Sequence, residues 1–134
     1  MESTDTESIR LTVPATSAAV RITRAGAAAL ATRAGFTYRE VEQLRLAVGE
    51  AAALLAPDTE GDGQLAVTYD LGAGGLLIDL HLVDPGGPAG VAVVPAVAAA
   101  VLDNSVDEWR VGDGGRQLVL VKRRSGDDDD TDDD

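Results

Sequence analysis

The sequence neighbours of one acidic residue, Glu50, are compatible with a catalytic role for its carboxylate. Glu50 has Leu46 four residues before it and Leu54 four residues after it, and residues four apart share one side of a helix. A carboxylate within an apolar helix face is expected to point into a pocket or an interface, where it could act as a general base. The alternative is an acid held by a local hydrogen bond at a partly buried interface.

A second group of candidate residues follows a predicted strand. Asp84 begins the run Asp-Pro-Gly-Gly, which includes Gly86 and Gly87. Glycines so placed could cradle a phosphate, but the segment lacks the lysine of a P-loop and the glycine spacing of a dinucleotide fold. Asp-Pro-Gly is also ordinary turn chemistry, so a plain loop is the alternative interpretation.

A helix over residues 37–55 must position Glu50. Thr37 and Glu40 form a capping-box pattern that predicts its start, and Pro57 predicts its end. One side of this helix carries apolar residues at helical spacing, and we expect that side to face the core. Its members are Val41, Leu44, Val48, Ala52 and Leu55.

The remaining pattern predicts an α+β fold. Alternating or apolar runs indicate strands at residues 9–13, 65–70, 76–82, 106–111 and 116–122, and alanine-rich runs indicate helices at 16–33 and 94–102. This order predicts a two-layer sandwich, with a mostly antiparallel five-stranded sheet and three helices on one face. We expect one domain over residues 8–124, with residues 1–7 flexible and the acidic residues 125–134 disordered.

The amino-acid composition and net charge argue against several classes of function. The 134 residues contain no cysteine and carry a formal net charge of −12. No basic stripe accompanies this acidity, so nucleic-acid binding is not expected. The chain shows neither an apolar run of about 20 residues that could span a membrane nor a signal-peptide start. We expect a cytoplasmic protein.

Two neighbouring residues are candidates for binding a protein partner. Trp109 and Arg110 belong to the residue types that dominate interface energetics, although Trp109 could equally pack against the helices. His81 has no second histidine or cysteine nearby and is interpreted as structural. Residues 122–124, Lys-Arg-Arg, precede the acidic tail. They could bind an acidic partner, but we expect them to pair with the tail.

Three segments together resemble a known family, the serine-kinase and anti-sigma-factor branch of the Bergerat-fold (GHKL) ATPases. Residues 44–54 (LRLAVGEAAAL) are similar to the family's N box, in which a Glu is followed four residues later by Asn. Asp84-Pro-Gly-Gly stands where the family has an Asp-x-Gly-x-Gly box. Residues 106–111 and 114–123 resemble the family's closing hairpin.

The resemblance implies specific roles, and the sequence departs from some of them. By this likeness Glu50 matches the general base and Asp84 the acid that reads the adenine amino group, with Gly86 and Gly87 beside it. Leu54, however, occupies the position of the Asn that ligates Mg²⁺, and an alkyl side chain cannot bind a cation that requires oxygen. The segment between Ala89 and Asp103 also lacks the Gly-x-x-Gly-x-Gly box that holds the phosphates in this family.

We therefore expect a regulatory binding protein rather than an enzyme, without a cofactor or metal. By resemblance its partner would be a sigma factor or an anti-sigma antagonist. One alternative is an ATP- and Mg²⁺-dependent serine/threonine protein kinase that uses Glu50 and Asp84. Another is a structural homodimer in which Leu46, Leu54 and residues 91–97 fill the former pocket.

Overall fold

The computed structural model describes residues 7–56, 63–83 and 93–125. These residues form five strands, three helices and one short 3₁₀ turn. In chain order they are β1 (Glu7–Pro14), α1 (Ser17–Arg33), α2 (Tyr38–Leu55), β2 (Gln64–Leu71), β3 (Gly75–Val83), α3 (Ala96–Ser105), β4 (Glu108–Gly112), η1 (Asp113–Gly115) and β5 (Gln117–Arg123).

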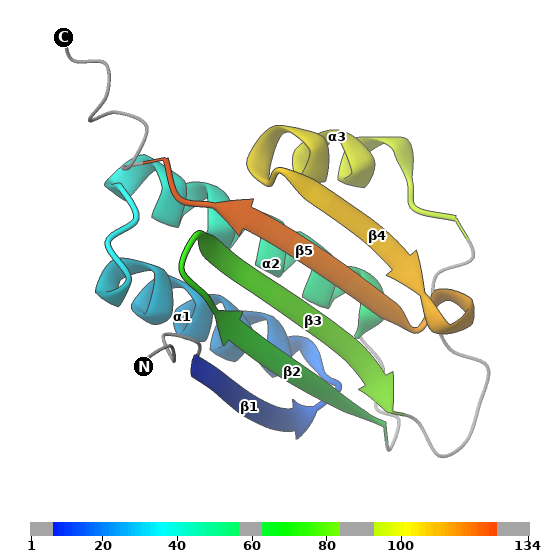
Figure 1. Cartoon of the computed structure of the whole chain (residues 1–134). Helices are drawn as coiled ribbons and strands as arrows, with labels where there is room; N and C mark the ends of the chain where they lie inside the picture. The colour runs from blue at the N-terminus through cyan, green and yellow to red at the C-terminus, as the bar shows by residue number, and fades with distance from the viewer. Residues whose placement is uncertain (1–6, 57–62, 84–92, 126–134) are drawn as a thin grey trace, which may run out of the picture.

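The strands form one sheet in the order β1-β2-β3-β5-β4, and all four neighbouring pairs are antiparallel. The three helices lie on one side of this sheet and leave its other face open (Figure 1). The predicted α+β sandwich is therefore confirmed. Its sheet is antiparallel throughout the described strands.

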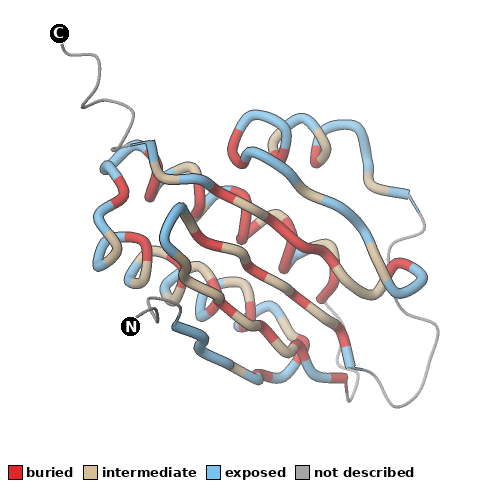
Figure 2. Tube along the Cα trace, viewed as in Figure 1, coloured by how far each residue is buried: buried red, intermediate tan, exposed pale blue. Residues whose placement is uncertain are grey.

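The core lies between the sheet and the helices. Alternate residues of β2 and β3 point toward the helices and are buried, as strand geometry requires (Figure 2). The predicted core side of α2 is buried along its whole length. Fully burying one leucine or valine stabilises a fold by roughly 1.5–3 kcal/mol, so this layer holds α2 firmly on the sheet.

Helix α1 lies close enough to the sheet to require a glycine. A Cβ atom built on Gly26 would lie 2.8 Å from the hydroxyl oxygen of Tyr69. That buried hydroxyl donates a hydrogen bond to the carbonyl oxygen of Thr23 at 3.0 Å, and burial raises the pKa of Tyr69 to about 12. Gly26, which lowers the intrinsic stability of the helix, thus makes room for a buried and satisfied tyrosine.

The predicted start of α2 is confirmed, whereas the predicted bounds of the third helix are wrong. Thr37 and Glu40 form both hydrogen bonds of the capping box, and Gly35 takes a φ of +91° after α1. The third helix, predicted at residues 94–102, instead runs from Ala96 to Ser105. Asn104 does not break it, because its side-chain amide donates to the carbonyl oxygen of Ala100 at 2.8 Å.

Candidate functional site

Glu50 lies on the side of α2 that faces away from the sheet. The residue is half-buried, while Ala47 and Ala51 beside it are fully buried. Within the described ranges, its carboxylate has no hydrogen-bond or ion-pair partner. The acid is therefore neither fully solvated nor engaged in holding the fold together.

The two leucines that flank Glu50 occupy different environments. Leu54 is half-buried and packs against the core, so it contributes to folding at the position where the resembled family has a metal ligand. Leu46 leaves 58% of its surface exposed. The apolar face predicted around Glu50 is thus only partly covered.

Helix α3 adds further exposed apolar side chains next to α2. The two helices pack against each other, and the end of α2 and the start of α3 lie at the same end of the molecule (Figure 1). Val93 and Val97 are 78% and 76% exposed. We refer to Leu46 and Glu50 on α2, Val97 on α3 and Val93, three residues before the start of α3, as the α2–α3 surface.

The sequence pattern of α3 could have indicated this surface. Its first seven residues are alanine, valine and leucine only, yet the buried positions of the helix are confined to Ala98, Leu102 and Ser105. A helix that is apolar on all sides is normally covered on all sides. Its remaining apolar surface is available to something outside the described chain.

The other residues expected around a nucleotide cannot be compared with Glu50. Asp84, Gly86 and Gly87 lie outside the described residues. Their roles in reading adenine and in backbone approach therefore stay predictions.

Trp109 and Arg110 do not form one joint anchor, because successive strand residues point to opposite faces. Trp109 packs against the core, and its indole N–H donates to a carboxylate oxygen of Asp103 at 2.8 Å. Arg110 is exposed and, by the strand register, shares the open face with Val119. A partner could touch both residues only by contacting two different sides of the sheet.

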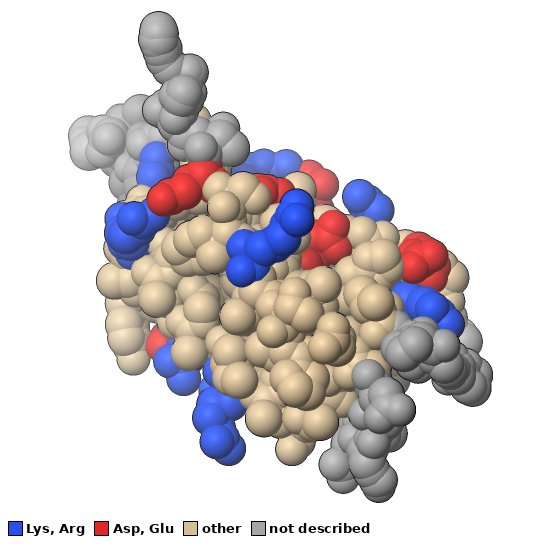
Figure 3. Space-filling view, turned by 90° about the horizontal axis from the view of Figure 1, so that it is seen from below, with Lys and Arg blue, Asp and Glu red and all other residues tan. Residues whose placement is uncertain are grey.

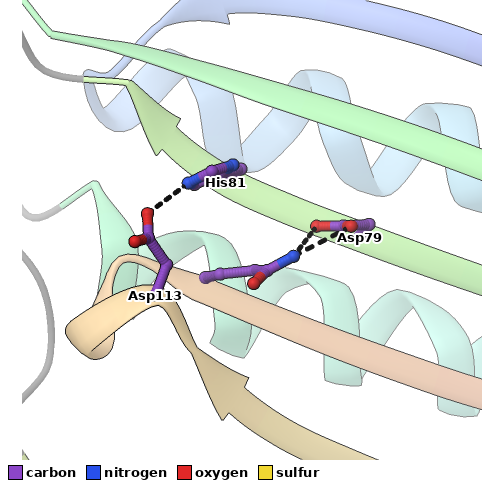
Figure 4. Close-up of polar contacts among 4 residues, drawn as sticks. Asp79, His81 and Asp113 are labelled. Carbon is purple, nitrogen blue, oxygen red and sulfur yellow. Dashed lines mark hydrogen bonds and ion pairs between the residues drawn. The ribbon is translucent and has the colours of Figure 1, made fainter.

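The open face carries a polar cluster that the sequence did not reveal (Figure 4). The Nε2 atom of His81 lies 2.6 Å from a carboxylate oxygen of Asp113. On the same face the amide of Gln117 donates to both carboxylate oxygens of Asp79 at 3.0 Å. The antiparallel register places His81 opposite Gln117, which brings the η1 turn within reach. Since the side chains of His81 and Asp113 are 41% and 52% exposed, their pairing contributes little to stability.

The first of the three basic residues before the acidic tail, Lys122, is buried. Lys122 is 8% exposed, and its ammonium group donates to Gln43 Oε1 at 2.6 Å and to the carbonyl oxygen of Ser105 at 2.8 Å. Burial lowers the pKa of Lys122, although the nearby carboxylates of Asp107 and Glu40 oppose this effect. The charge of this lysine is thus held between α2 and the end of α3, while the acidic tail with which it was expected to pair lies outside the described residues.

The two arginines that follow Lys122 are also engaged within the fold. Arg123 forms an ion pair with Glu108, and Arg124 donates to the carbonyl oxygen of Ala34 at 2.8 Å. Their described contacts therefore tie the end of β5 to neighbouring elements.

Neither protein-family models nor curated proteins match this chain. Among the described helices, none combines the length and the apolar character needed to cross a membrane.

Proposed function

We propose that this chain is a regulatory binding protein of the anti-sigma type, which acts through protein–protein contact at the α2–α3 surface. The observation that supports this most strongly is the exposure of Leu46 on α2, of Val97 on the adjacent α3 and of Val93 just before α3. Exposed apolar side chains that gather together mark interaction sites more often than isolated ones do. This function would be exercised in the cytoplasm.

Glu50 gives the proposed contact its specificity. A half-buried carboxylate without a partner in the described part of the chain would lose water when a partner covers it. Such a loss is costly unless the partner supplies a basic side chain that pairs with the carboxylate. The partner is therefore expected to present lysine or arginine among apolar residues.

A binding experiment with purified proteins tests this proposal. Sigma factors and anti-sigma antagonists from the organism that encodes the chain are titrated against it without nucleotide. We expect one of them to bind, and the variants Leu46→Glu and Val97→Glu to weaken that binding by about tenfold or more, which corresponds to about 1.4 kcal/mol. Tyr38→Glu is the matched control, since Tyr38 is an 80% exposed apolar residue at the start of α2.

The same experiment can overturn the proposal. If no member of either class binds at micromolar concentration, the anti-sigma assignment fails. If a partner binds equally well to all three variants, the α2–α3 surface is not the binding site.

One observation favours the second candidate, an ATP-dependent serine/threonine protein kinase. The unengaged carboxylate of Glu50 would be available as a general base or to orient an attacking hydroxyl. Thermal unfolding with ATP or ADP, with and without Mg²⁺, separates the candidates. A nucleotide at about 100 times its dissociation constant would raise the free energy of unfolding by about 2.7 kcal/mol. A shift that disappears in Glu50→Ala or Asp84→Asn would favour the kinase over the binding protein.

A further inference from the structure

Strand β1 forms one edge of the sheet and is open on one side. All eight of its residues pair with β2 in an unbroken antiparallel register, and none of the described strands pairs with its other side. In such a ladder, alternate residues direct their backbone N–H and C=O groups away from the neighbouring strand. Half of the hydrogen-bonding groups of β1 are therefore unpaired within the described sheet.

The usual protections of an edge strand are weak here. Natural edges are blunted by bulges, short strands, prolines or charged side chains. The register of β1 contains no bulge, and Pro14 stands at its last position. At the opposite end of β1, the acidic side chain of Glu7 forms an ion pair with Arg33 of α1. Residues 8–13 thus present a regular edge with Arg10 as the only charged residue.

The surface around this edge is poor in charge. Figure 3 shows the side of the molecule that carries β1 and α1, with a broad central area free of lysine, arginine, aspartate and glutamate. Ile9 on β1 and Ile22 on α1 are 38% and 42% exposed. In a chain with a net charge of −12, two copies repel each other at long range. They can approach most closely where charged side chains are absent.

We propose that β1 pairs with β1 of a second copy of this chain, antiparallel and across a two-fold axis at Leu11. In this register Ile9 faces Val13 of the second copy and Arg10 faces Thr12. Opposed residues then share one face of the joined sheet, so the apolar side chains of both strands meet on the helix side. A register centred on Arg10 would instead place two arginines opposite each other, which is destabilising.

This pairing does not depend on the proposed function. The sheet order puts β1 at one edge and β4, next to α3, at the other. A dimer formed through β1 would leave Leu46 and Val97 accessible. Failure of one proposal therefore leaves the other intact.

Sedimentation equilibrium of the full chain tests the dimer. We expect a species of twice the 13.8 kDa chain mass at tens of micromolar concentration. Ile9→Lys should raise the dissociation constant by about tenfold or more, which corresponds to about 1.4 kcal/mol, whereas Tyr38→Lys, with the same charge on a distant exposed site, should not. A monomer at hundreds of micromolar, or a dimer that Ile9→Lys leaves unchanged, would overturn the proposal.

Single cysteines test the register, because the natural chain has none. Leu11→Cys would face itself across the axis at a Cα separation of about 4.5–5.5 Å, which a disulfide can span. Arg10→Cys or Thr12→Cys alone would face its own copy only diagonally, at about 7–8 Å, and should not cross-link. A mixture of those two variants should cross-link to each other. Cross-linking that does not follow this pattern would overturn the register, and a shared unfolding midpoint would confirm that each variant is folded.

Discussion

Two acidic residues of helix α2, Glu40 at its start and Glu50 in its second half, differ in burial and in hydrogen bonding. At the start, Glu40 is 7% exposed, and its two carboxylate oxygens accept hydrogen bonds from the backbone N–H groups of Thr37 at 2.8 Å and Ser125 at 2.9 Å. In the second half, Glu50 is half-buried and has no partner within the described residues. Glu40 therefore links α2 to Thr37 and to Ser125, whereas Glu50 makes no such link within the described residues.

The surroundings of the two acids differ in the same way. Next to Glu40, the buried ammonium group of Lys122 is bound by Gln43 and Ser105, so the polar groups at this end satisfy one another. Near Glu50, Leu46 is exposed without a described neighbour to cover it. Residues that break the ordinary rules of burial without stabilising the fold are where function is expected. The first end of α2 therefore explains stability, and the second end is the place to look for binding.

The largest expected effect comes from removing the buried lysine. Lys122→Ala leaves the acceptors of Gln43 and Ser105 unsatisfied and opens a cavity, so we expect a loss of about 3 kcal/mol in the free energy of unfolding. Lys122→Met leaves the same acceptors unsatisfied but nearly keeps the volume, so it should cost less than the alanine variant, about 1–2 kcal/mol. Urea unfolding measures both. Equal losses for the two variants would mean that the charge itself, rather than the filled space, stabilises this end.

The next largest change in the free energy of unfolding is expected for Glu40→Ala, with Glu50→Ala as its comparison. Glu40→Ala removes the capping-box hydrogen bond and the anchor of Ser125, which should lower the free energy of unfolding by about 2 kcal/mol. Glu50→Ala should change it by no more than about 0.5 kcal/mol, because it breaks no described contact. Urea titrations of both variants against the natural chain provide the measurement. A large loss in Glu50→Ala would show that this acid also serves the fold.

The pH dependence of stability should also show that the Glu40 carboxylate stabilises the fold. The expected change in the free energy of unfolding is smaller than that for Glu40→Ala. Burial by itself raises the pKa of Glu40, but hydrogen bonds from Ser125 and Thr37 outweigh it, and the net pKa lies below the ordinary value of 4.5. A lowered pKa stabilises the fold above the unfolded-state value, and this contribution is lost as the pH falls through the folded-state value. The stability difference between the natural chain and Glu40→Gln should therefore stay constant from neutral pH to about pH 5 and shrink below about 4.5. A difference that does not change with pH would contradict this role for the carboxylate.

The contacts of Glu40 and Lys122 also show which features can be predicted from local sequence and which cannot. The start of α2, its core side and the strand runs follow from short-range patterns, because a capping box or an alternating strand is encoded within a few residues. The Ser125 contact of Glu40 spans 85 positions in the chain and that of Lys122 with Gln43 spans 79. Such pairs depend on the strand order, which the sequence pattern left undetermined. For this reason, the interpretation of residues 122–124 from the sequence did not include the contacts of Lys122 within the fold.

The site is predicted less completely than the fold for the same reason. The helical spacing singled out Glu50 as an acid between apolar neighbours, but it treated Leu46 and Leu54 as equivalent. Whether α3 covers a residue of α2 depends on how the two helices pack, which spacing along one helix does not encode. Asp113 joins His81 only through the register of β3 with β5.

The smallest change in stability is expected at the surface proposed for binding. Leu46→Gln and Val97→Gln together should change the free energy of unfolding by no more than about 0.5 kcal/mol, because both side chains are already mostly exposed. The same double variant should lower the fluorescence of an apolar dye bound to the native protein, since the dye binds exposed apolar surface. Urea unfolding and dye titration on the same samples provide the two measurements.

Tyr38→Gln is the matched control for this pair, because it removes an exposed apolar side chain without touching the α2–α3 surface. A fall in dye signal in the double variant that is more than twice the fall in the control would mean that Leu46 and Val97 form a binding surface rather than scattered exposed residues. If instead the double variant lost about 2 kcal/mol or more, these side chains would be contributing to the core. The contrast between the two ends of α2 would then disappear, because both ends would serve the fold.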